Sequence, residues 1–110
     1  MSDSIVAQVR EWYLENYQIL LALYAKVNLK VHSPEDPIRG KVAIQLDSPL
    51  VGATLSFWNK GDVMAIGIDK VKGREFSFDD RVMESTEQVT GLLSSYVERM
   101  KELISGSPSK

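Results

Sequence analysis

The hydrophobic pattern of this chain changes its period twice, and that change limits the folds open to it. Apolar residues recur every three or four positions over roughly residues 4–25 and 86–105, the spacing of a helix with one buried face. Between these segments, short runs alternate apolar and polar residues, as strands with one solvent-exposed face do. The pattern therefore predicts an α+β fold, in which an antiparallel meander of four or five strands stands between an N-terminal and a C-terminal helix.

Each predicted helix carries a continuous apolar stripe. Ser2 and Ser4 are both candidate N-caps of the first helix, and Ser85 with Gln88 fits a capping box for the second. We expect Gly91 to let the second helix approach the sheet or the first helix closely. The first stripe consists of Ile5, Val9, Trp12, Tyr13, Asn16, Tyr17, Leu20, Leu23 and Tyr24, and the second of Val89, Leu92, Leu93, Tyr96, Val97, Met100, Leu103 and Ile104.

The strands are expected at residues 26–32, 41–46, 53–58 and 63–69, with a short fifth strand at 75–78. Both helices need an apolar surface, so we expect a two-layer sandwich with both packed on one face of the sheet. That face would hold Val27, Leu29, Val31, Val42, Ile44, Leu46, Leu55, Phe57, Met64, Ile66 and Ile68. The open face would hold Lys26, Asn28, Lys30, His32, Lys41, Ala43, Gln45, Thr54, Ser56, Trp58, Val63, Ala65 and Gly67.

The length of 110 residues fits a single domain, expected over 1–106 with a disordered tail at 107–110. A net charge of −2 argues against general nucleic-acid binding. The absence of cysteine excludes disulfides and thiolate metal sites. The longest apolar run, Ile19–Ala25, is far shorter than the ~20 residues that span a bilayer. We expect a cytoplasmic protein with no membrane or nucleic-acid partner.

The sequence contains no recognisable catalytic motif. The one histidine, His32, falls on a wet strand face and is interpreted as a surface residue. Asp79 and Asp80 lack the further oxygen ligands of a cation loop, and no glycine-rich phosphate loop or nucleophile elbow is present. We therefore predict no catalytic residue, no metal and no cofactor, and interpret the chain as a binding protein rather than an enzyme.

Two features suggest where a partner would bind. Glu75–Glu87 contains five acids (Glu75, Asp79, Asp80, Glu84, Glu87) against one base, and forms either a solvated loop leading into the last helix or an acidic patch for a basic partner. Trp58, at the rim of the open face, either shields the hairpin or anchors a partner. The candidate partner-binding residues are Trp58, Glu75, Asp79, Asp80 and Glu84.

The segment Val51–Ile68, VGATLSFWNKGDVMAIGI, resembles small bacterial immunity proteins of polymorphic toxin systems, and is most similar to the TriTu-type family. The likeness lies in Phe57-Trp58 followed by Gly61 at the hairpin and then an apolar strand, within a helix–strands–helix layout. The resemblance implies an immunity protein of a type VI secretion or Rhs system. Such a protein would neutralise a cognate antibacterial toxin, an ADP-ribosyltransferase in the TriTu case, by tight one-to-one binding in the producer's cytoplasm. It also implies a monomer in the free state.

Two other functions fit the same pattern. A secretion or assembly chaperone would hold a client segment in an exposed apolar groove, and would form a dimer when isolated. A small-ligand-binding subunit would need a cavity between the helices and the sheet, lined by Tyr13, Tyr17 or Tyr96.

Overall fold

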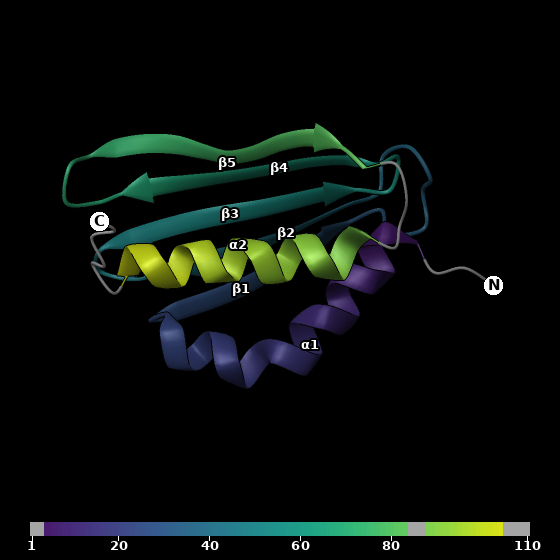
Figure 1. Ribbon diagram of the computed structural model, residues 1–110. Coiled ribbons are helices and arrows are strands. Elements are labelled where there is room, and N and C mark those ends of the chain that lie inside the picture. The colour runs from purple at the N-terminus through teal and green to yellow at the C-terminus, as the bar shows by residue number, and fades with distance from the viewer. Residues whose placement is uncertain (1–3, 84–87, 105–110) are drawn as a thin grey trace.

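The computed structural model describes residues 4–83 and 88–104, without the side chains of residues 76–79, 103 and 104. The elements are α1 (Ile5–Leu23), β1 (Lys26–His32), β2 (Lys41–Asp47), β3 (Val51–Trp58), β4 (Asp62–Asp69), β5 (Arg74–Val82) and α2 (Val89–Ile104). Figure 1 shows both helices on the same side of the sheet, with α2 in front of the middle strands and α1 running obliquely on the β1 side. The predicted α+β sandwich is confirmed.

The sheet is an antiparallel meander in the order β1-β2-β3-β4-β5, so β1 and β5 form its two edges. The fifth strand is longer than predicted. The observed β5 runs from Arg74 to Val82 and includes Asp79 and Asp80, which one interpretation of the charge pattern placed in a loop. The segment pairs along the whole of β4, with one register shift opposite Ala65/Ile66. Charged residues are common on edge strands because they discourage pairing with another sheet.

The prediction of which residues face the helices is correct for β1, β2 and β3 and wrong for β4. Phe57 pairs with Val63 and Leu55 with Ala65, and directly paired residues point to the same face. Val63 and Ala65 are therefore buried under the helices, while Met64 and Ile68 are exposed. The hairpin sets this register, and its length places the smaller β4 residues inside, whatever the hydrophobicity of their neighbours.

The core lies between the sheet and the two helices. Phe57, Ile44 and Leu55 from the sheet meet Leu20 from α1 and Leu93 and Met100 from α2, all almost fully buried. The rings of Phe57 and Tyr96 lie with centroids 6.3 Å apart, which ties the middle strand to α2. Burial of this apolar surface is the main favourable term that holds the layers together.

The helix ends follow local rules where they are described. Ser4 is the N-cap of α1, and its Oγ accepts a hydrogen bond from the Ala7 N–H at 3.1 Å. Ser2, Ser85, Gly106 and the tail at 107–110 lie outside the described residues. The expectation for Gly91 is wrong: this glycine is exposed, and a Cβ built on it meets nothing within 4 Å. It permits no close packing, because its side of α2 faces solvent.

Tyr24, which ends α1, buries its hydroxyl without a hydrogen-bond partner among the described residues. The residue is 3% exposed, and burial raises the pKa of its hydroxyl above the usual 10.0. A buried polar group without a partner costs about 1–3 kcal/mol. Tyr24→Phe should therefore stabilise the protein by about 1 kcal/mol, measured by urea unfolding at pH 7.

The pH dependence provides a second readout for Tyr24. Because its folded pKa is raised, the folded state holds a proton that the unfolded state loses above pH 10.0. Ionisation of Tyr24 therefore leaves stability unchanged below that pH and favours the unfolded state above it. Tyr24→Phe should flatten the alkaline loss of stability. An unchanged slope together with a destabilised variant would contradict this account of the hydroxyl.

Candidate functional site

The face of the sheet turned away from the helices carries an apolar row along β4. Met64 is 37% exposed and Ile68 is 41% exposed, with Ile66 half-buried between them. The residues beside them on β3 are small or polar: Ser56, Thr54 and Gly52 pair with Met64, Ile66 and Ile68 respectively. Large apolar side chains next to small ones make a surface that a partner can cover without removing water from charged groups. We call Met64, Ile66 and Ile68 the apolar row.

The first hollow on this open face lies around Met64, with a volume of about 750 Å³. Trp58 forms one side, and the Lys41 Nζ lies 4.9 Å from the centre of its ring, which fixes the indole by a cation–π contact. Val82 and Ile38, both about two-thirds exposed, add apolar surface opposite it. The hollow is lined by Ile38, Arg39, Trp58, Lys60, Asp62, Val63, Met64, Asp80, Arg81 and Val82.

Asn59 holds the loop that walls the first hollow. Its Nδ2 donates hydrogen bonds to the carbonyls of Pro34 and Asp36, both at 3.0 Å. Its Oδ1 accepts the Val6 N–H at 3.0 Å, one of the N–H groups that a helix start leaves unpaired. One side chain therefore joins the β3–β4 hairpin, the β1–β2 loop and the start of α1.

The same loop contains its own cap. The carboxylate of Asp36 accepts the backbone N–H groups of Arg39 and Ile38, and these bonds hold the pKa of Asp36 below its ordinary value. Ile38 and Arg39 are thereby fixed at the wall of the hollow. The Asp36 carboxylate stays ionised at neutral pH, so it keeps accepting both hydrogen bonds and holds this wall of the hollow in place.

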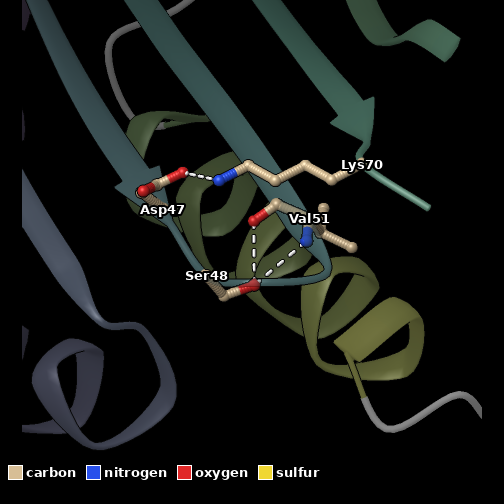
Figure 2. A network of polar contacts seen from close by, with 4 residues as sticks. All are labelled: Asp47, Ser48, Val51 and Lys70. Carbon is tan, nitrogen blue, oxygen red and sulfur yellow. Dashed lines mark hydrogen bonds and ion pairs between the residues drawn. The ribbon is translucent and has the colours of Figure 1, made fainter. Parts of the chain in front are cut away.

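The second hollow lies at the other end of the apolar row, around Ile66 and Ile68, with a volume of about 530 Å³. Figure 2 shows the polar contacts of Asp47, Ser48, Val51 and Lys70 at this end of the sheet. Lys70 from the β4–β5 turn forms an ion pair with Asp47, and its backbone N–H donates to the Leu50 carbonyl at 2.9 Å. The hollow is lined by Gln45, Leu46, Asp47, Gly52, Ala53, Thr54, Ile66, Ile68, Lys70 and Glu75.

Ser48 has a structural role in the turn beside this hollow. Its Oγ donates to the Val51 carbonyl at 2.9 Å and accepts the Val51 N–H at 3.1 Å, as Figure 2 shows. The hydroxyl is buried and engaged on both sides. It closes the β2–β3 connection that follows Asp47.

The structure brings two of the five candidate residues together. Trp58 and Asp80 both line the first hollow. Glu75 lines the second hollow, at the far end of β5. The side chain of Asp79 and the whole of Glu84 lie outside the described residues.

The residues that the sequence analysis missed are those of the apolar row. The alternation in β4 correctly separated Met64, Ile66 and Ile68 from Val63, Ala65 and Gly67, but the two sets were assigned to the wrong faces. The parity of the hairpin, with five residues between the paired Phe57 and Val63, decides the assignment. Counting residues across that turn is the signal that would have found the row.

The other residues considered from the sequence take ordinary positions. His32 is exposed at the end of β1. Tyr13 and Tyr96 are buried in the core and line neither hollow. Within residues 4–83 and 88–104, no helix has both the length and the hydrophobicity needed to cross a bilayer.

Comparisons of the chain with protein-family models, with curated proteins and with solved structures find no match.

Proposed function

We propose that this protein is an immunity protein that binds a cognate antibacterial toxin on the open face of its sheet. The observation that carries the proposal is the exposed apolar row beside the Trp58 hollow. Interfaces between proteins depend on a few large side chains that lose their contact with water, surrounded by polar groups that set orientation. Met64 and Trp58 fit the first role, and Asp80, Asp62 and Lys60 fit the second.

The resemblance to TriTu-type proteins supports the same face. The segment that carries it, Val51–Ile68, forms β3 and most of β4. These strands present Trp58 and the apolar row on the open side. The partner it implies is an ADP-ribosyltransferase toxin of an Rhs or type VI secretion system, and the place of action is the producer's cytoplasm. The acids Asp80 and Glu75 would then meet basic groups of the toxin.

The test is co-expression with a toxin domain encoded next to the gene for this chain. The intact protein should restore growth and co-purify with the toxin at one to one. Met64→Lys should weaken the complex at least about 30-fold, the effect of losing a central anchor. Leu14→Lys is the matched control, because Leu14 is 70% exposed on α1, in the helix layer. Absence of a neighbouring toxin gene would overturn the proposal. Restored growth without formation of a complex between the two proteins would also overturn it.

The apolar row also favours a second candidate, a chaperone for a secreted or assembling client. An apolar surface flanked by two open hollows suits an extended segment as well as a folded domain. Titration calorimetry separates the two functions. An immunity protein should bind the folded toxin domain and ignore isolated segments of it, whereas a chaperone should bind a client segment alone.

A further inference from the structure

The strand register arranges the open face in rows that run across all five strands. One row consists of Lys30, Ala43, Ser56, Met64 and Asp80, and another of Lys26, Asp47, Gly52, Ile68 and Glu75. Both of these rows start with a lysine on β1 and end with an acid on β5. Because β1 and β5 are the opposite edges of the sheet, the two rows place lysines at one edge of the open face and acids at the other.

This charge pattern is its own complement under one symmetry operation. A two-fold axis parallel to the strands, passing over β3, turns a second copy face to face with the first and lays its β1 over β5. Lys30 of each copy then lies over Asp80 of the other, and Lys26 over Glu75. A two-fold axis perpendicular to the strands would instead place lysines over lysines. Two packed sheets cross at about 30° because each is twisted, which shifts these partners along the strands but keeps the lysine edge over the acidic edge.

The shapes of the side chains agree with the same arrangement. The strand under the axis, β3, presents Gly52, Thr54 and Ser56 to the open side, so two sheets can approach closely along this stretch, and Trp58 beyond it meets Trp58 of the other copy. Met64 of one copy lies over Ala43 of the other, a large side chain against a small one. Ile68 of one copy lies over Asp47 of the other. The charge of Asp47 is already balanced by its ion pair with Lys70.

From these rows we infer that the free protein forms a symmetric dimer, in which a second copy of this chain covers the open face. The dimer shields the apolar row from water until a partner replaces the second copy. It differs from the free monomer that the resemblance implies. The inference does not rest on the toxin as partner, since the charges and the apolar row belong to the chain alone.

Sedimentation equilibrium at low salt tests the dimer. The protein should have twice its chain mass of 12.3 kDa at micromolar concentration, and should dissociate as salt is added. Lys30→Glu and Asp80→Lys should each weaken the dimer about tenfold or more, because symmetry repeats every altered contact. Far-ultraviolet circular dichroism confirms that both variants are folded.

Mixing the two single variants provides the decisive arm. In the mixed dimer, the glutamate introduced at position 30 of one copy meets the lysine introduced at position 80 of the other. The second contact joins the two unaltered residues, Asp80 of the first copy and Lys30 of the second. Both contacts are then attractive, so the mixed dimer should form more tightly than either variant alone. Restoration within one copy is excluded because β1 and β5 are about 19 Å apart, four strand spacings.

A monomeric protein, or a dimer that Leu14→Lys breaks and the charge variants leave intact, would overturn the inference. Either result leaves the toxin test above unaffected, because that test measures a different complex.

Discussion

Asn59→Ala should destabilise the protein by about 3 kcal/mol. The side chain of Asn59 makes three hydrogen bonds of 3.0 Å, to Val6, Pro34 and Asp36, and each contributes about 1 kcal/mol. A loss of that size should lower the Tm by about 10–20 °C in a domain of this length. Thermal and urea unfolding measure both quantities.

Asn59→Asp distinguishes the contribution of the side-chain acceptor, Oδ1, from that of the donor, Nδ2. The aspartate keeps an acceptor for Val6 at the start of α1, where a negative charge is favourable. It loses both donors and sets a carboxylate against the carbonyls of Pro34 and Asp36. We expect a loss of about 2 kcal/mol at pH 7, and a smaller loss below pH ~4, where a protonated carboxyl can donate again. If Asn59→Ala costs less than ~1 kcal/mol, Asn59 does not hold the loop.

Gly40→Ala should be about as damaging, at about 3 kcal/mol, for a steric reason. A Cβ at this position would lie 2.5 Å from the Asp36 carbonyl oxygen and 2.8 Å from that of Ser33, and closer still to the Asn59 Nδ2. The two carbonyls cannot move cheaply, because they accept backbone hydrogen bonds from Gly40 and Asp36 at 2.9 Å. Overpacking of this kind costs about 1–3 kcal/mol, and backbone neighbours favour the upper end.

Gly91→Ala is the matched control for Gly40→Ala. It is the same substitution at an exposed helical position where the new methyl group meets nothing within 4 Å. Alanine is the better helix former, so this variant should be more stable by about 0.5–1 kcal/mol. Equal effects at the two glycines would contradict the close packing around Asn59.

The Asn59 cluster also connects stability with binding. Gly40 and Asn59 fix the loop that presents Ile38 and Arg39 to the first hollow. Variants at either position should therefore weaken partner binding in addition to folding stability. Met64→Lys, in contrast, changes an exposed side chain and should affect binding far more than stability.

Most of the fold followed from local patterns. The helical stripes and the alternating strands predicted every element, because each pattern reflects which side of one element faces solvent. Ser4 as a helix cap followed from local chemistry in the same way. The length of β5 did not, because its charged residues match no apolar alternation and its strand form depends on pairing with β4.

The candidate site was only partly predictable. Trp58 and Asp80 were expected at the partner surface and lie in one hollow, but Glu75 lies in another. The apolar row was assigned to the core because Met64, Ile66 and Ile68 are larger than Val63, Ala65 and Gly67. Hydrophobicity alone ranks the first set as more buried, and only the register of the β3–β4 hairpin reverses that order.

By itself, the sequence determined which segments are helices and strands and that one side of the sheet is covered, since periodicity is a property of consecutive residues. The tertiary structure decided which side of β4 is covered, which charges share an edge, and that Asn59 joins three distant segments. Those properties depend on pairing between residues far apart in the chain, and no local pattern records it.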